Sequence, residues 1–548
     1  MRWMLSKLWS GISSFWMLAF LVLLLVGGFV YVNSEYNRME FVFGTSARNV
    51  GTQMMTLIAA GVLFVWFMIN RHFSLKLKGV GLILLAAAGI GAASSIRRIG
   101  FNGDNIPVVE FTWTPTTEQR LAEAGIESPE DDAKPKLVSL DPAILEGPAC
   151  PSFLGPNHDG YVQACSFTPA KESAPPTEKW RHPVGGGYAA FAVEGDLAVT
   201  IEQRGPKEVI SAYKVSTGEP LWTLGYPALF SETMGGDGPR ATPTIDGKHV
   251  FVLGATGELN CIELLTGKSL WHVNILTDAD MKNIVWGMSG SPLVTEKLVI
   301  VNPGGDDKHD RGVIAYDRET GKIVWSKGNH PAAYVSPALV TIDGVPQVIL
   351  QSADTLSGQD LATGEELWQT PFKPMNGIAV GQPLLLPDNQ VFVSASYGAG
   401  AKLVKVTKDG EKWKVDPVWD NQLLRCKFSS PIYVDGYIYG LDDGILACLD
   451  AKTGKRKWKG GRYGHGQMLY SDNRLFIQAE DGNFVIVATD PKKHRELLKW
   501  QSLPGIKNWN APTLAGNRLL VRNHYEMAAY ELPCSESAPT STEAPPSS

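Results

Sequence analysis

Cysteine is scarce in this chain, which has 6 Cys among 548 residues. A disulfide scaffold therefore does not hold the fold together, and a large buried core must do so. The sequence also lacks Cys-x-x-Cys, His-Glu-x-x-His, phosphate-loop and Gly-x-Ser-x-Gly motifs, so the common metal, nucleotide and serine-hydrolase signals are missing. A hydrophobic share of 44% excludes a disordered chain.

Positive charge is in short supply beyond residue 100. The first 100 residues carry 9 Lys and Arg against 2 Asp and Glu, whereas the rest of the chain carries 41 against 54. An acidic balance of this size excludes a nucleic-acid-binding face as the main function of the large part.

Long apolar runs are confined to residues 1–100, which we interpret as a membrane anchor with about three transmembrane helices at 14–32, 53–70 and 79–93. No small-residue cleavage site follows the first run, so it is expected to be an uncleaved anchor. Lys and Arg at the helix ends divide five to four in favour of an inside N-terminus. Three crossings would place the large part outside the cytoplasm, whereas two would leave it inside.

Residues 101–177 are Pro-rich and acidic, and we expect a linker with one short helix at 117–124. Cys150 and Cys165 flank a turn-rich segment and either form a disulfide in an oxidising compartment or remain two thiols. Residues 533–548 are rich in Ser, Thr, Pro and Glu and are predicted to be a disordered tail.

A repeat dominates the chain from residue 178 onwards. Five copies share a Thr-Gly followed four residues after the Gly by Trp, as in Asp450-Ala-Lys-Thr-Gly-Lys-Arg-Lys-Trp458. Degenerate copies supply three further Trp. We expect all eight to lie on outer strands and fill the gaps between neighbouring units as structural blade-docking residues: Trp180, Trp222, Trp271, Trp325, Trp368, Trp413, Trp458 and Trp500.

The spacing of these Trp, 42 to 54 residues, is typical of β-propeller blades. Two strands joined at an Asp-Gly turn precede each Thr-Gly hairpin, which gives four strands in a blade. The sequence thus predicts an all-β, eight-bladed propeller over residues 178–532. The last blade lacks an outer strand, which residues 178–183 are expected to supply as a clasp that closes the ring.

One residue of each blade-connecting loop is predicted to lie at the mouth of the channel, three residues before the start of the inner strand. These positions include the candidate ligand-binding residues Arg240, Tyr334, Phe428, His465 and Trp509. The two longest loops add Asp237 and Trp286. An Arg with several aromatic rings suits an anionic or planar ligand, with Arg240 the foremost candidate, although the same side chains could simply plug the channel.

Other chemical signals are weak. Cys261 and Cys448 occupy equivalent strand positions and are expected to be buried small hydrophobes. The Asp-rich segment 304–310 is interpreted as a solvated hairpin tip rather than a cation loop, and no metal site is assigned.

The intact repeat at 450–458 resembles the tryptophan-docking repeat of the pyrroloquinoline quinone (PQQ) propeller superfamily. Segments 153–160, 238–243 and 286–292 are similar to bacterial PQQ-binding-like repeat proteins. The resemblance implies either a quinoprotein dehydrogenase, which holds PQQ and calcium, or a non-catalytic scaffold like the propeller lipoprotein of the outer-membrane assembly machinery. The chain has no adjacent Cys pair, and its calcium ligands cannot be assigned from the motif.

The favoured function is therefore a non-catalytic binding or scaffold protein in the bacterial inner membrane, with its propeller in the periplasm or outside the cell. Its expected partner is a protein in or near the membrane. A PQQ-dependent alcohol or sugar dehydrogenase and a ligand sensor are the alternatives.

Overall fold

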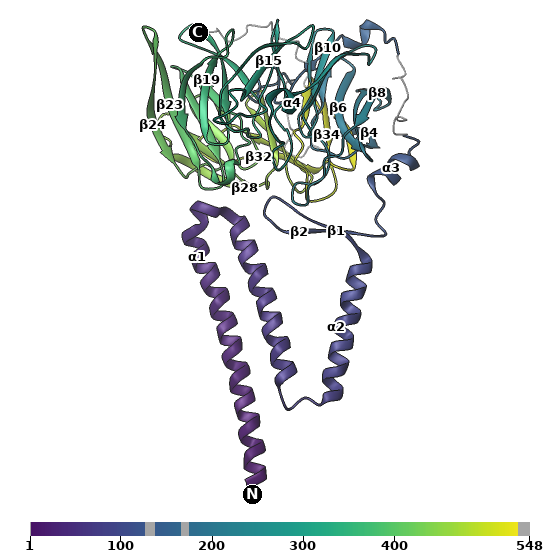
Figure 1. Ribbon diagram of the computed structural model, residues 1–548, viewed down its shortest axis with the longest axis vertical. Coiled ribbons are helices and arrows are strands. Elements are labelled where there is room, and N and C mark those ends of the chain that lie inside the picture. Colours follow the sequence, from purple (N-terminus) through teal and green to yellow (C-terminus); the bar gives the residue numbers. More distant parts are fainter. Residues whose placement is uncertain (1, 127–137, 166–174, 535–548) are drawn as a thin grey trace. The chain divides into compact units, whose positions relative to one another are not determined.

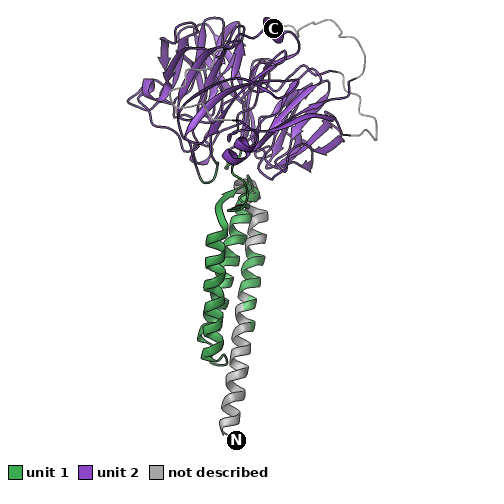
Figure 2. Cartoon of the chain, turned by 90° about the vertical axis from the view of Figure 1, so that its right-hand side faces the viewer, with its two compact units in different colours: residues 1–116, 233–236, 396–398 green, residues 117–232, 237–395, 399–548 purple. Residues whose placement is uncertain are grey.

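The computed structural model describes residues 2–126, 138–165 and 175–534. The chain divides into two compact units, shown in Figure 2. Unit 1 contains residues 1–116, 233–236 and 396–398, and unit 2 contains the remainder.

Unit 1 is helical with one small hairpin. Helix α1 (Arg2–Ile69) is interrupted at Gly44, whose φ of 63° is non-helical, and Figure 1 shows α1 folding back on itself as two arms. Helix α2 (Leu75–Ser95) begins after Ser74, whose hydroxyl caps the Leu77 N–H at 3.2 Å. Strands β1 (Ile96–Phe101) and β2 (Pro107–Phe111) then form a two-stranded antiparallel hairpin.

Two helices among the described residues are long and apolar enough to cross a membrane, Gly44–Ile69 and Leu75–Ser95. They contain the predicted stretches 53–70 (to Ile69) and 79–93. The stretch 14–32 lies in the first arm of α1, most of whose side chains are outside the described residues, so a span there stays a prediction.

The start of the supposed linker belongs to unit 1. Side chains of the second arm of α1 bond to backbone oxygens of the β1–β2 turn: Asn49 to Asp104 at 2.8 Å and Gln53 to Asn105 at 2.8 Å. A spacer was therefore the wrong interpretation for this segment, because polar residues at the helix start bind the hairpin backbone.

Unit 2 is an eight-bladed propeller, which confirms the predicted fold (Figure 1). Each blade is an antiparallel sheet. Blade 1 has β5 (Ala192–Glu194), β6 (Leu197–Arg204), β7 (Lys207–Lys214) and β8 (Pro220–Pro227). Blade 2 has β9 (Thr244–Asp246), β10 (His249–Leu253), β11 (Glu258–Glu263) and β12 (Ser269–Asn274). Blade 3 has β13 (Leu293–Val294), β14 (Leu298–Val301), β15 (Val313–Asp317) and β16 (Ile323–Lys327). Blade 4 has β17 (Ala338–Ile342), β18 (Val345–Gln351), β19 (Thr355–Asp360) and β20 (Glu366–Pro371).

The other four blades repeat this order, with the inner strand first. Blade 5 has β21 (Leu384–Leu386), β22 (Gln390–Ala395), β23 (Gly400–Asp409) and β24 (Lys412–Asn421). Blade 6 has β25 (Ile432–Val434), β26 (Tyr437–Asp442), β27 (Ile445–Asp450) and β28 (Arg456–Arg462). Blade 7 has β29 (Gln467–Ser471), β30 (Arg474–Gln478), β31 (Asn483–Ala488) and β32 (Glu496–Gln501). Blade 8 has β33 (Thr513–Ala515), β34 (Arg518–Arg522), β35 (Glu526–Glu531) and, as its outer strand, β4 (Thr177–Pro183).

The outer strand of blade 8 is the predicted clasp. Strand β4 pairs with β35, and Trp180 stands opposite Ala529. The clasp prediction is therefore confirmed. Trp180 also donates its indole N–H to the Val215 oxygen of blade 1 at 2.8 Å, so the first strand of the propeller links the last blade to the first.

A buried ion network crosses the same closure. Glu202 accepts a hydrogen bond from Arg204 at 2.9 Å, and neither side chain is more than 1% exposed. Arg522 of blade 8 donates to the Thr200 hydroxyl of blade 1 at 2.7 Å. Burial raises the pKa of Glu202, but the charges of Arg204 and Arg522 outweigh burial and hold this pKa at about 2.

Tryptophan docking follows one register in most blades. The Trp lies beside a bulge in the outer strand and donates its indole N–H to a backbone oxygen of the next blade, as Trp222 does to Leu264 at 2.9 Å. The Thr-Gly turn leaves room for the ring, because a Cβ on Gly267 would approach Trp222 within 2.8 Å. Trp271, Trp325 and Trp458 donate to the next blade in the same way. Trp368 instead donates to Gln347 within blade 4 at 2.7 Å.

One predicted docking residue, Trp413, was wrong, and another, Trp500, fills a gap between blades from outside the shared register. In blade 5 the hairpin of β23 and β24 is longer, so Trp413 lies near its tip, and Trp419 occupies the docking register and donates to Ala451 at 2.8 Å. In blade 7 Leu498 occupies the register. Trp500 lies two residues further along β32, where it packs on Phe484 and Tyr530 and its indole N–H has no partner within the described residues.

The described residues 117–126 and 138–165 of the predicted linker belong to unit 2. Helix α3 (Thr117–Glu123) confirms the predicted short helix, and a 3-10 turn η1 (Pro142–Leu145) and strand β3 (Ala149–Cys150) follow. Strand β3 pairs with β5 and extends blade 1 to five strands. Short helices also lie in two blade-connecting loops, α4 (Ile275–Ala279) and η2 (Met375–Gly377).

Residues 151–161 cross one end of the channel. Pro151 accepts from Ile245 of blade 2 at 2.8 Å, and the Tyr161 hydroxyl donates to the Tyr433 oxygen of blade 6. These blades are opposite one another in an eight-membered ring. Both contacts are made by inner strands, near the turn that leads to the second strand of the blade. The crossing therefore lies at the end of the channel opposite the blade-connecting loops.

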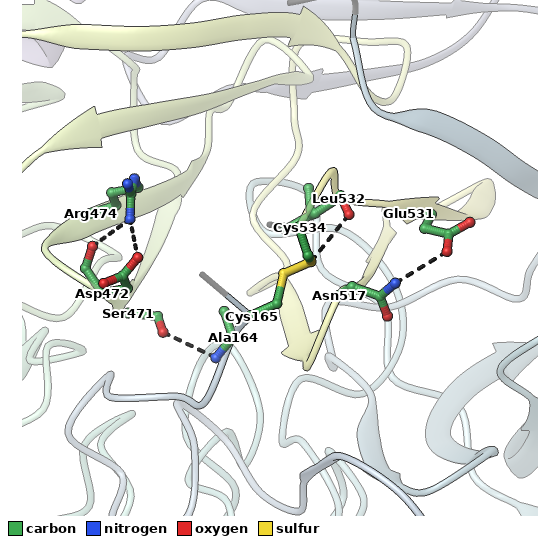
Figure 3. The surroundings of a disulfide bond; sticks show 9 residues. All are labelled: Ala164, Cys165, Ser471, Asp472, Arg474, Asn517, Glu531, Leu532 and Cys534. Atoms are coloured by element: carbon green, nitrogen blue, oxygen red, sulfur yellow. Dashed lines mark hydrogen bonds and ion pairs between the residues drawn. A yellow bond between two sulfur atoms is a disulfide. The ribbon is translucent and has the colours of Figure 1, made fainter. Parts of the chain in front are cut away.

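The structure shows neither of the two predicted arrangements of Cys150 and Cys165, a disulfide between them or two thiols (Figure 3). Cys165 forms a disulfide with Cys534, while Cys150 is a buried thiol in β3. Cys534 lies in the predicted disordered tail, so that prediction fails for its first residues, and residues 535–548 lie outside the described residues. Cys261 and Cys448 are buried, as expected.

Candidate functional site

The loops that enter the inner strands are joined by a belt of hydrogen bonds around the channel. In each case a backbone N–H donates to the side chain just before the next inner strand: Ala190 to Thr242 at 3.1 Å, Thr242 to Ser291 at 3.0 Å, Ser291 to Ser336 at 2.8 Å, Ser336 to Gln382 at 2.8 Å and Gln382 to Ser430 at 3.1 Å. The belt fixes these loops at one level, so residues two positions earlier are held at corresponding places on the rim.

Aromatic rings from four consecutive blades lie in a row on this rim. His465 contacts Phe428, with ring centroids 5.6 Å apart, and Phe428 contacts Trp509 at 4.8 Å. Trp509 contacts Tyr188 at 5.3 Å. We call these four residues the rim row. Three of them were predicted from the alignment of the loops, and Tyr188, one residue after the aligned Gly187, was missed.

Cations lie over the rings of the rim row. Lys507 Nζ is 4.5 Å from the centroid of Trp509 and 5.8 Å from that of Tyr188, and Lys427 Nζ is 5.5 Å from that of Phe428. A cation–π contact contributes about 0.5–1 kcal/mol at an exposed site and about 2 kcal/mol when desolvated. Lys507 is half-buried and Lys427 is buried. Neither lysine was a candidate, although both lie within two residues of an aligned aromatic.

Arg240 extends the row into the loop between blades 1 and 2. Its guanidinium lies 5.4 Å from the Tyr188 ring and 4.8 Å from the Phe230 ring, and it donates to the Gly238 oxygen at 2.6 Å. Burial lowers the pKa of Arg240 below its ordinary value. The guanidinium is thus held between two rings and its own loop.

The remaining predicted residues lie beside this row. Trp286 and Tyr334 form their own pair, with centroids 5.6 Å apart. Burial raises the pKa of Tyr334 to about 12. Asp237 accepts from the Ser231 hydroxyl at 2.6 Å, a contact that shapes the loop carrying Arg240.

Two carboxylates near the rim already have strong partners. Glu480 accepts from the Trp509 indole N–H at 2.7 Å and from the His465 backbone at 3.1 Å. Buried Asp442 pairs with three cations: Arg425 at 2.8 Å, Arg456 at 3.2 Å and Lys459 at 2.6 Å. These carboxylates orient the rim and neutralise charge.

Comparison with known proteins shows which families this ring resembles. The family model described as "Outer membrane protein assembly factor BamB" matches residues 206–460. Over these residues the chain is similar to PQQ-repeat β-propellers.

Two kinds of PQQ-repeat propeller are similar to it. "Outer membrane protein assembly factor BamB" of Burkholderia pseudomallei is 27% identical over 408 residues, which cover 70% of this chain and 94% of that protein. "Quinoprotein alcohol dehydrogenase PedH" of Pseudomonas putida is 22% identical over 301 residues, 53% of this chain and 44% of that enzyme. The solved quinohemoprotein alcohol dehydrogenase from Comamonas testosteroni shares the fold, with a TM-score of 0.52, 13% identity and coverage of 74% of this chain and 84% of that one.

Proposed function

We propose that this PQQ-repeat propeller is a membrane-anchored, extracytoplasmic binding or scaffold protein without catalytic activity, and that it acts on a protein partner in or near the membrane. Its binding face is the rim row with Arg240, Lys427 and Lys507. Tyr188, Phe428 and Trp509 are half-buried and offer stacking surfaces, and Lys507 places positive charge beside them, which together suit aromatic and acidic groups of a partner.

The observation that carries the proposal is that two carboxylates near the rim row, Glu480 and Asp442, already have hydrogen-bond or ion-pair partners. A catalytic acid, base or calcium ligand needs an available carboxylate, whereas Glu480 and Asp442 are held by Trp509 and by three cations. The similarity to BamB over 94% of its length supports the same conclusion.

The disulfide supports an extracytoplasmic propeller. Disulfides persist in oxidising compartments and are rare in the cytosol. Cys165 and Cys534 are 369 residues apart and come together only when the ring is closed. Three crossings, by the first arm of α1, Gly44–Ile69 and Leu75–Ser95, would place that bond outside an inner membrane.

A PQQ-dependent dehydrogenase is the second candidate, because several relatives bear that activity in their names. A planar anionic quinone matches the rings and cations of the rim row. Calcium requires six to eight oxygen ligands, and the engaged Glu480 and Asp442 do not supply such a set. Glu480 and Asp442 therefore do not fit the calcium of a quinone site, and no catalytic step is assigned to them.

One pair of measurements tests the two functions. The full chain, purified in detergent, is titrated with PQQ and calcium while quinone absorbance and melting temperature are recorded. We expect no saturable binding, and saturable binding with a raised melting temperature would overturn the scaffold proposal. In parallel, a photo-crosslinking residue in place of Phe428 should capture a protein partner in native membranes, and the same residue in place of Val324 on β16 is the control.

A further inference from the structure

Blades 6 and 7 reverse the charge balance of the propeller. Residues 449–501 carry eleven Lys and Arg against six Asp and Glu, although the chain beyond residue 100 has 41 against 54. The excess lies on the outer hairpins. We call the following residues the basic wall: Lys452, Lys455 and Lys457 of blade 6, and Lys492, Lys493, Arg495 and Lys499 of blade 7.

The two halves of the basic wall form one surface. Trp458 of β28 donates its indole N–H to the Asp490 oxygen, in the turn between β31 and β32, at 2.8 Å. The same turn carries His494, whose ring lies 5.7 Å from Trp458 and whose Nε2 is 2.8 Å from the Tyr463 hydroxyl. The lysines that flank these contact residues in both blades are thereby brought together.

These cations are exposed and are not neutralised by ion pairs. In the part of the chain that the structure describes, none of the seven makes an ion pair. Some outer-strand lysines of other blades are paired: Lys327 with Glu365 at 2.9 Å, Lys414 with Asp416 at 2.8 Å and Lys179 with Glu531 at 2.9 Å. The basic wall differs in that seven exposed cations without an ion pair among the described residues are gathered on two neighbouring hairpins.

Protection of a sheet edge does not explain the basic wall. Lysines do discourage pairing between exposed edge strands, and a few would serve each blade. Strand β12 (Ser269–Asn274) and strand β8 (Pro220–Pro227) are also outer strands, yet neither contains a lysine. Seven unpaired cations on two neighbouring blades repel one another, and an anionic partner would remove that cost.

We infer that the basic wall is a docking surface for an acidic, extended segment of a partner protein. An extended chain presents alternate side chains on one face about 6–7 Å apart, so a run of Asp and Glu can contact several cations of the two hairpins in turn. Among the described residues 449–501 no large apolar side chain is exposed, whereas proteins that bind lipid surfaces usually insert such groups. The surface thus favours an acidic polypeptide over an anionic bilayer.

This inference names a partner class for the scaffold function and rests on that proposal. The basic wall is separate from the rim row, however, so the two fail separately. PQQ binding at the rim would overturn the scaffold function and leave binding at the basic wall to be judged from its own measurement.

The test uses the full chain in a neutral detergent and a fluorescein-labelled Glu-Ser repeat peptide as the probe. The triple variant Lys457→Glu/Lys492→Glu/Lys493→Glu changes the basic wall. Its matched control, Lys268→Glu/Lys322→Glu/Lys412→Glu, makes the same charge change at exposed lysines of blades 2, 3 and 5. Fluorescence anisotropy gives the affinity, and melting temperature verifies that both variants fold.

We expect the basic-wall variant to lose at least about tenfold in affinity and the control variant to lose less than about threefold. A Gln-Ser peptide should not bind. Equal losses in the two variants, or no binding of the Glu-Ser peptide to the unchanged chain, would overturn the inference. Vesicles of phosphatidylglycerol and phosphatidylethanolamine serve as a second probe, and binding to them without binding to the peptide would replace the acidic polypeptide with a lipid surface.

Discussion

Replacement of Trp419 by Phe should destabilise the propeller far more than replacement of Trp413. Trp419 donates to the Ala451 oxygen at 2.8 Å and lies against Gly454 of blade 6. Loss of that hydrogen bond costs about 1–1.5 kcal/mol, and loss of the second indole ring from the interface costs about 1 kcal/mol more. The expected decrease in the free energy of unfolding is therefore about 2–2.5 kcal/mol.

Trp413 provides the matched control. It lies near the tip of the β23–β24 hairpin, half-buried, with Lys408 Nζ 5.7 Å from its ring, a contact that Phe can keep. Trp413→Phe should cost at most about 1 kcal/mol. Thermal and urea unfolding of the full chain, followed by circular dichroism, measure both variants. A cost for Trp413→Phe equal to or above that for Trp419→Phe would refute the assignment of the docking register.

Three further predictions concern the closure of the ring. Cys165→Ser/Cys534→Ser should lower stability by about 2–4 kcal/mol and abolish the effect of reductant on melting temperature, whereas Cys150→Ser should leave that effect in place. The pKa of Glu202 is lower in the fold than in the unfolded chain, so its stabilisation is complete above about pH 4.5 and is lost as the pH falls toward 2. Glu202→Gln should flatten that part of the stability–pH curve and cost about 3–5 kcal/mol at pH 7, and a curve unchanged from the unsubstituted chain would contradict the network. Deletion of residues 178–183 should lower the melting temperature sharply, and an unchanged value would contradict the clasp.

The blade pattern could be predicted because the residues that specify each hairpin are close together in the sequence. A Thr-Gly turn and a Trp four residues later specify a hairpin and its register without reference to the rest of the chain. In blade 5 that signal fails, since Gly410 and Glu411 form the turn and two Trp follow. The choice of Trp419 depends on where Ala451 and Gly454 of the next blade lie, which is a tertiary property.

The disulfide and the channel crossing were beyond sequence reasoning for a related reason. Cys165 was close to Cys150 in the sequence, but its partner Cys534 is 369 residues away and adjacent only through ring closure. Residues 151–161 contain so many turn formers that they resemble a linker. The Pro151 oxygen and the Tyr161 hydroxyl instead bond to inner strands of opposite blades.

The residues of the rim could be predicted only in part from the sequence. Alignment of the loops on the inner-strand Pro brought out Phe428, His465 and Trp509, because the belt of hydrogen bonds holds equivalent positions at one level. It missed Tyr188 and Lys507, which reach the same rings from neighbouring positions. Side-chain reach of that kind is decided by packing between loops.

The pairing of β4 with β35 also dictates an order of events during biosynthesis. The outer strand of blade 8 is made first and its three partners last, so residues 177–183 must wait for more than 340 residues to be synthesised before they can pair. Blades 1 to 7 can assemble as the chain emerges, but they remain an open arc with an unprotected edge until residues 526–531 arrive. A chaperone that protects this arc would act late, after nearly the whole propeller has been made.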